Sequence, residues 1–94
     1  MNKKIEFAKQ LEKRTLQFAI DITQFSATLG NTTEIKVIRN QITKSGTSIG
    51  ANYREANRSR SKNDFKNKIS ICLSEASETL YWLELIIELK ISKR

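Results

Sequence analysis

The stretch Lys44–Phe65, KSGTSIGANYREANRSRSKNDF, decides the fold of this chain. Its first half has the composition of a loop and its second half that of a charged helix, so the question is whether a loop interrupts the helix here. Hydrophobic periodicity answers that question. Core-type positions continue through the stretch at steps of three and four: Ile35, Ile38, Ile42, Ser45, Ile49, Asn52 and Ala56. A loop would shift that phase, so the pattern predicts one helix over residues 32–58.

Two glycines inside this predicted helix need a physical reason, since each costs about 1 kcal/mol relative to alanine. Gly46 and Gly50 lie one turn apart among small residues, which makes a low surface where another helix backbone can approach. Asn52 and Thr79 are polar residues on core stripes. We expect them to hydrogen-bond each other or a backbone carbonyl and so fix helix register, the alternative being a polar pocket.

Composition and capping signals define the rest of the chain. The chain has 94 residues, no proline and three glycines, and this composition predicts a single all-α domain over residues 1–94. Asn31 with Glu34, and Ser61 with Asp64, have the spacing of helix N-caps. We therefore expect an antiparallel up-down bundle of three long helices, at about 3–27, 32–58 and 62–91. The expected core positions of the last helix are Phe65, Ile69, Cys72, Ala76, Thr79, Leu83 and Ile86.

Positive charge is concentrated in the middle of the chain, whose net charge is +7. Residues 39–68 hold eight of the 17 cations but only two of the ten acids. These cations are Arg39, Lys44, Arg54, Arg58, Arg60, Lys62, Lys66 and Lys68. Such a cluster favours a polyanion, because phosphate backbones release counterions on binding and arginine forms bidentate contacts with phosphate. The alternative is a solvated face that serves solubility. Tyr53 could stack on a base, but packing is the commoner use of such an aromatic residue.

The residue types needed for catalysis are scarce, and we expect no enzyme and no cofactor. The chain has no histidine, which removes the commonest general base and metal ligand. Glu55, Glu75 and Glu78 could form a metal site, but ion pairs with neighbouring cations fit them better. Cys72 lies on a core stripe and should act as a small apolar filler. A single cysteine fits a cytoplasmic location, and no apolar run approaches the roughly 20 residues that cross a bilayer.

Three segments carry a resemblance to a known family: KSGTSIGANYREA, SKNDFKNKI and EASETLYWL, in this order between Gln41 and Leu83. They resemble the four-helix-bundle family of the 23S rRNA intervening sequence proteins, which includes the accessory variability determinants of diversity-generating retroelements. The resemblance implies an up-down bundle, a homopentamer and no catalytic residues. In the retroelement branch it also implies a basic surface that binds RNA or DNA, and a reverse transcriptase as partner.

The sequence departs from the family in its last segment. Family members usually have a fourth helix after the YWL segment, whereas these 94 residues have no room for one, through truncation or as a natural variant. The end of the last predicted helix is apolar on most sides, so other helices must pack against most of these sides to keep them from water. We therefore expect Trp82, Leu85 and Leu89 to contribute to a homo-oligomer interface.

Two functions from different classes remain open. The first is a non-enzymatic accessory protein that binds nucleic acid, RNA or an RNA-protein complex, through the basic junction between the second and third helices. Its predicted contacts are Lys44, Arg54, Arg58, Arg60, Lys62, Lys66 and Lys68. The second is a helical assembly module whose partner is another protein, with no role for nucleic acid.

Overall fold

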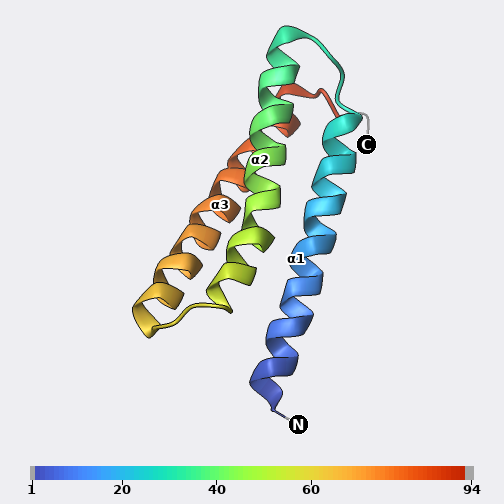
Figure 1. The fold of residues 1–94 in the computed structure, drawn as a ribbon. Helices are drawn as coiled ribbons and strands as arrows, with labels where there is room; N and C mark the ends of the chain where they lie inside the picture. Colours follow the sequence, from blue (N-terminus) through green and yellow to red (C-terminus); the bar gives the residue numbers. More distant parts are fainter. Residues whose placement is uncertain (1, 93–94) are drawn as a thin grey trace.

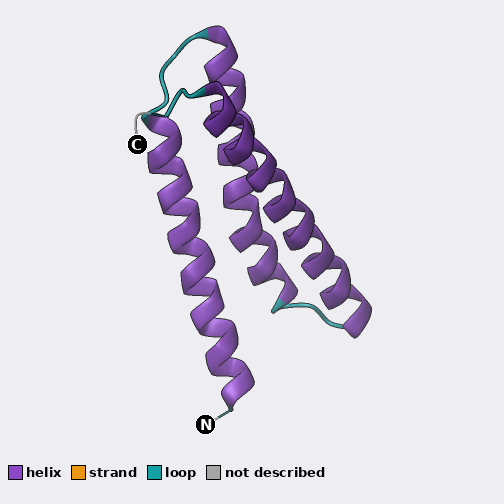
Figure 2. Cartoon of the chain, turned by 180° about the vertical axis from the view of Figure 1, so that it is seen from behind, coloured by secondary structure: helices purple, strands orange, loops and turns teal. Residues whose placement is uncertain are grey.

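The computed structural model describes residues 2–92 and consists of three helices joined by short loops (Figure 1; Figure 2). They are α1 (Lys3–Ala27), α2 (Thr33–Ala56) and α3 (Lys62–Leu89). Consecutive helices run in opposite directions (Figure 1). The segment SGTSIG lies inside α2, so the unbroken hydrophobic phase identified its structure correctly.

Side-chain caps set the helix starts, with one difference from the sequence prediction. Ser61 caps α3 as expected, accepting a hydrogen bond from the Asp64 amide at 3.1 Å. The cap of α2 is Thr32, whose hydroxyl oxygen accepts from the Ile35 amide at 3.2 Å, so the prediction of Asn31 was wrong. Asn31 instead accepts from the Arg39 guanidinium, which also donates to the carbonyl of Gly30 at 3.0 Å. Arg39 thus braces the α1–α2 loop.

The three helices form one layer with α2 in the middle. Helix α2 packs against both α1 and α3. Among the described residues, no Cα of α1 lies within 8 Å of a Cα of α3. The overall dimensions of 47 × 25 × 17 Å agree with this layered shape, which is visible in Figure 1. Helices α1 and α3 therefore each keep a long side that no described helix covers.

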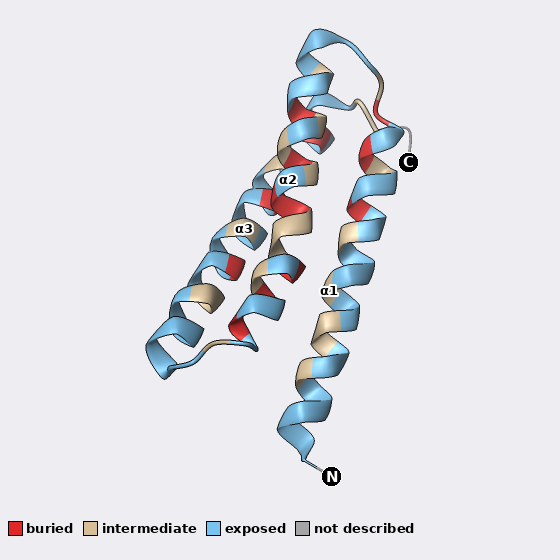
Figure 3. Cartoon of the chain, in the orientation of Figure 1, coloured by how far each residue is buried: buried red, intermediate tan, exposed pale blue. Residues whose placement is uncertain are grey.

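The densest apolar packing lies toward the end that carries the α1–α2 loop. The core residues there are Ile22, Leu29, Ile38, Ile42 and Ile86. Figure 3 shows that buried residues on α1 gather in its C-terminal half, while α2 has them along most of its length. On α3, Cys72, Thr79 and Ile86 are buried, whereas Phe65 and Ala76 are exposed. The predicted core position was wrong for those two residues, because α1 does not reach that side of α3.

The two glycines of α2 lie directly against α1. A Cβ atom on Gly46 would be 2.8 Å from Cγ2 of Ile22. A Cβ atom on Gly50 would be 3.0 Å from Oγ1 of Thr15 and 3.3 Å from its backbone carbonyl carbon. A Cβ atom at Gly46 would force Ile22 to move, and one at Gly50 would crowd Thr15, so glycine at both positions lets the α1 and α2 backbones approach closely. This contact offsets the poor helix propensity of glycine.

Buried hydroxyl groups connect α2 to α3. Oγ1 of Thr79 lies 2.8 Å from Oγ of Ser45 and 2.8 Å from the Glu75 carbonyl oxygen, and both side chains are fully buried. The predicted polar contact on the core stripe is therefore made by Thr79 with Ser45 rather than with Asn52. Asn52 donates to the Ser48 carbonyl of its own helix at 2.9 Å. A satisfied polar pair between two helices favours one axial alignment over others.

Substituting Gly46 tests the close contact between α1 and α2. Gly46→Leu should lower the free energy of unfolding by about 1–3 kcal/mol, because overpacking outweighs the better helix propensity of leucine. Urea denaturation followed by circular dichroism measures the change. Ala51→Leu is the control on an exposed position of the same helix and should stay within about 0.5 kcal/mol of the parent. A Gly46→Leu protein more stable than the parent would contradict this packing.

Replacing Thr79 by Val tests the hydroxyl contact between α2 and α3. The substitution keeps the side-chain shape and removes the hydroxyl, so the free energy of unfolding should fall by about 0.5–1.5 kcal/mol. Thr23→Val is a matched control, because the Thr23 hydroxyl also donates within its own helix, to Ala19 at 2.8 Å, but is exposed. Equal losses in the two variants would show that the contact between helices adds nothing.

Candidate nucleic-acid interface

Cations from all three helices meet at the end of the layer opposite the α1–α2 loop. The start of α1, the end of α2 and the start of α3 lie there (Figure 1). We define the basic end as Lys3, Lys4, Arg54, Arg58, Arg60, Lys62, Lys66 and Lys68. Six of these residues were predicted from the junction sequence. Lys3 and Lys4 were missed, although an antiparallel three-helix order does bring the first residues of the chain to that junction.

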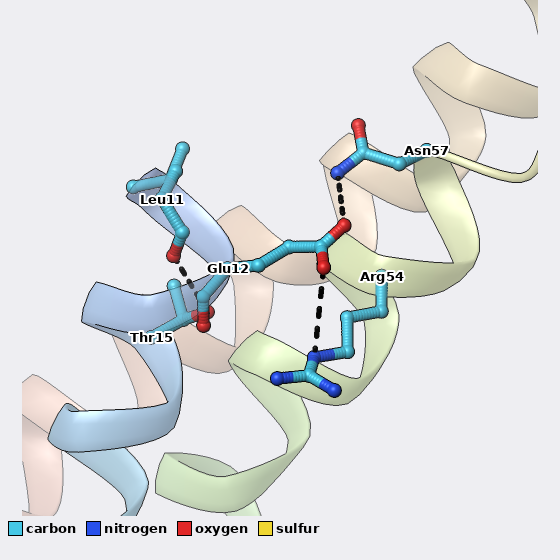
Figure 4. A network of polar contacts seen from close by, with 5 residues as sticks. All are labelled: Leu11, Glu12, Thr15, Arg54 and Asn57. Atoms are coloured by element: carbon cyan, nitrogen blue, oxygen red, sulfur yellow. Dashed lines mark hydrogen bonds and ion pairs between the residues drawn. The ribbon is translucent and has the colours of Figure 1, made fainter. Parts of the chain in front are cut away.

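Two members of the basic end are engaged with acids. Nε of Arg54 is 3.9 Å from a carboxylate oxygen of Glu12, whose other oxygen accepts from the Asn57 amide at 2.9 Å (Figure 4). Nζ of Lys68 is 3.6 Å from Glu55. Exposed pairs of this kind are weak. They lower the local positive charge at Arg54 and Lys68 without removing either side chain from solvent.

The remaining cations of the basic end are exposed and have no ion pair within residues 2–92. They are Lys3, Lys4, Arg58, Arg60, Lys62 and Lys66. Helices α1 and α3 both begin here, so the positive ends of two helix dipoles add to the side-chain charges, while the negative end of the α2 dipole offsets part of this effect. The acids Glu6 and Asp64, in the first turns of these helices, offset part of this potential. The balance at this end remains positive.

Lys44, which was predicted as a contact, lies apart from the basic end. It is exposed in the middle of α2, ten residues before Arg54, which corresponds to about 15 Å along a helix axis. Arg39 is more distant still and braces the opposite loop. Linear clustering in the sequence overstated the size of the patch, because a helix spreads its residues along its axis.

Two hollows flank the basic end. One, of about 550 Å³, is lined mainly by polar and charged residues of the α2–α3 junction, including Arg58, Arg60 and Lys68. The other, of about 480 Å³, lies between the start of α1 and the junction and includes Phe7, Tyr53 and Phe65. Tyr53 is buried, which agrees with a packing role rather than with base stacking.

The carboxylates lie apart from one another, and the single thiol is buried. Within the described part of the chain, no three residues among His, Cys, Asp and Glu come together as metal ligands would. Burial raises the pKa of the Cys72 thiol, and its sulfur donates to the Ile49 carbonyl at 3.4 Å. A buried, protonated thiol is a poor nucleophile. The exposed cations of the basic end give this part of the surface a positive charge.

The predicted oligomer-interface residues lie toward the opposite end of α3. Trp82 and Leu85 are half-buried against the core, and the Trp82 indole donates to Glu78 at 3.3 Å. Leu89 is exposed. As for membrane association, none of the described helices combines the length and the apolar character that a transmembrane span requires.

Comparison with known proteins assigns the family. The profile described as 23S rRNA-intervening sequence protein matches residues 8–94. A crystal structure from Bacteroides thetaiotaomicron, described as a protein with unknown function from the S23 ribosomal protein family, superposes with a TM-score of 0.84 at 44% identity. The match covers 93% of this chain and 78% of that one. A search of curated proteins found no match. The chain therefore belongs to the 23S rRNA-intervening sequence protein family.

Proposed function

We propose that this protein is a non-enzymatic, cytoplasmic accessory protein that binds nucleic acid, RNA or an RNA-protein complex, through its basic end. The observation that carries the proposal is the convergence of exposed cations from three separate chain segments, Lys3–Lys4, the end of α2 and the start of α3, on one end of the layer. Cations held on rigid helix ends can contact several phosphates at once. Release of the phosphate counterions then favours binding.

The chemistry of the basic end supports contacts to the nucleic-acid backbone rather than to bases. Arg58 and Arg60 lie in the short connection between α2 and α3, where their guanidinium groups can adapt to phosphate positions. Tyr53 is buried, with only 7% of its surface exposed. Phosphate contacts position a protein on nucleic acid without reading its sequence. The proposal therefore favours recognition of charge and shape.

A second candidate function is a protein assembly module, and the exposed apolar side chains favour it. Large apolar residues such as Phe7, Leu73 and Ile87 are more than half exposed. Surfaces of this kind mark sites that meet another protein. The two functions are compatible, because the apolar surface and the basic end involve largely different residues, and we propose a homo-oligomer that also binds nucleic acid.

Salt dependence of binding tests the nucleic-acid proposal. The affinity for an RNA or DNA duplex should fall steeply with salt, by a logarithmic slope of about −0.9 per neutralised phosphate on B-DNA. Replacing Arg58, Arg60 and Lys66 together by Gln should weaken binding and flatten the slope by up to about three contacts. All three are exposed, so the fold should persist. Fluorescence anisotropy across a salt series measures both quantities.

The control removes the same charge from elsewhere on the surface. Lys13, Lys36 and Lys44 are exposed residues outside the basic end, and their joint replacement by Gln should change affinity and slope much less. This control also asks whether Lys44 contributes. Equal losses from the two triple variants would indicate unspecific attraction by a +7 chain. Absence of binding near physiological salt would leave the protein assembly module as the function.

A further inference from the structure

One side of α1 carries apolar and basic residues that no described helix covers. We define the α1 edge as a single face of this helix, with members at steps of three and four residues: Ile5, Lys9, Lys13, Leu16 and Ile20. All of them are exposed, the apolar ones by 40% to 55%. The residues of α1 that contact the two glycines of α2, Thr15 and Ile22, lie on a different face. The α1 edge is therefore free to meet another molecule.

A hollow beside the α1 edge shows which way this face is turned. It has a volume of about 380 Å³ and lies between α1 and α2, where its lining includes Leu16, Thr47 and Ala51. The hollows that lie between α1 and α3 are lined by other residues of α1, among them Phe7 and Phe25. The α1 edge thus lies on the side of α1 away from α3, whatever fills the space between those two helices.

Helix α3 has a comparable face at the other border of the layer. We define the α3 edge by members that again follow steps of three and four residues: Ile71, Glu75, Glu78, Trp82, Leu85 and Leu89. Ile71 and Leu89 are 41% and 51% exposed, and Trp82 and Leu85 are half-buried. The hollows shared with α1 border a different side of α3, which includes Leu83. The α3 edge therefore lies on the side of α3 away from α1.

The two edges carry opposite charge. Lys9 and Lys13 belong to the α1 edge, and Glu75 and Glu78 belong to the α3 edge. No lysine or arginine occurs in residues 69–89, so the α3 edge has no cation of its own helix beside it. Charge of this kind selects the partner surface more than it adds affinity. The α1 edge of one copy therefore matches the α3 edge of another copy, and neither edge matches itself.

The two edges can meet with their helices parallel. Helices α1 and α3 run in the same direction, and both begin at the basic end (Figure 1). At 1.5 Å per residue, Lys13 lies about 15 Å from the start of α1 and Glu75 about 20 Å from the start of α3. Two copies side by side with their basic ends level therefore bring these groups within about one helical turn along the axis. Glu12, beside the α1 edge, is already engaged with Arg54 and Asn57.

We propose that copies of this chain assemble through unlike surfaces, with the α1 edge of each copy against the α3 edge of the next. The inference rests on the homo-oligomer proposed above and assigns its two contact surfaces, one of which contains Trp82, Leu85 and Leu89. Because the two edges lie at different borders of the layer, each copy has a separate neighbour at each edge. Such heterologous contacts generate a ring when the rotation between neighbours closes. The basic ends then lie on one side of the ring, where one nucleic acid can contact several of them.

Complementary variants test whether the contact joins unlike surfaces. Leu16→Asp removes the α1 edge and Ile71→Asp removes the α3 edge, both at exposed positions. In sedimentation experiments without nucleic acid, each variant alone should be a folded monomer. An equimolar mixture should form a dimer of one copy of each and nothing larger, since each copy keeps only one edge. Leu73→Asp is the control, at a 67% exposed position of α3 off the α3 edge, and should keep the oligomeric state of the parent.

Charge reversal tests the pairing of the ionic groups. Lys9→Glu combined with Lys13→Glu should weaken the assembly by at least about tenfold, because like charges then face each other. Glu75→Lys combined with Glu78→Lys should do the same. All four substitutions in one chain should restore the assembly, since the two edges are again complementary.

The control for charge reversal is Glu84→Lys combined with Glu88→Lys, which makes the same change of charge at exposed positions off the α3 edge and should leave the assembly unchanged. Circular dichroism verifies that every variant is folded. A parent that is monomeric at about 100 µM would contradict the homo-oligomer itself. A parent that forms an oligomer which both Leu16→Asp and Ile71→Asp leave intact, or which only Leu73→Asp dissociates, would overturn the assignment of the edges alone.

Discussion

The close approach of α1 to α2 at Gly46 and Gly50 is the contact on which the arrangement of the other parts depends. Because α2 has no side chains there, Ile22 and Thr15 of α1 lie directly against its backbone, and α1 occupies one side of the central helix. Helix α3 packs on a neighbouring face of α2, where Ser45 and Thr79 favour one axial alignment. The result is a layer in which α1 and α3 share a neighbour, and among the described residues no Cα of α1 lies within 8 Å of a Cα of α3.

This geometry explains why charge and apolar surface are separated in the molecule. The up-down order brings two helix starts and one helix end to the same place, and six exposed cations that have no ion pair among the described residues lie there. The core is concentrated toward the other end, around Ile42 and Ile86. The uncovered side of α3 extends between these ends. Family membership agrees with the helical architecture.

Much of the fold was predictable, because one physical signal dominated it. The unbroken phase through Ser45 and Ile49 identified α2 across an apparent loop, and the Ser61 cap marked the start of α3. The Thr32 cap was not predictable from spacing alone, because Asn31, one residue earlier, also has a side-chain oxygen that can cap the start of a helix. The exposure of Ala76 and the place of Lys3 at the basic end depend on which helices touch. Periodicity gives the faces of one helix but not the identity of the neighbour that covers them.

The uneven distribution of the core has a consequence for motion. The C-terminal half of α1 is anchored by Ile22 and Leu29, while its N-terminal half contacts α2 through the Thr15–Gly50 approach and the polar group of Glu12, Arg54 and Asn57. Local unfolding of the first turns of α1 therefore exposes little apolar surface and costs less free energy than global unfolding. Amide hydrogen exchange along α1 should accordingly slow from Lys4 toward Phe25. We therefore expect the first turns of α1, which carry Lys3 and Lys4, to move more than its C-terminal half, which the apolar core holds in place.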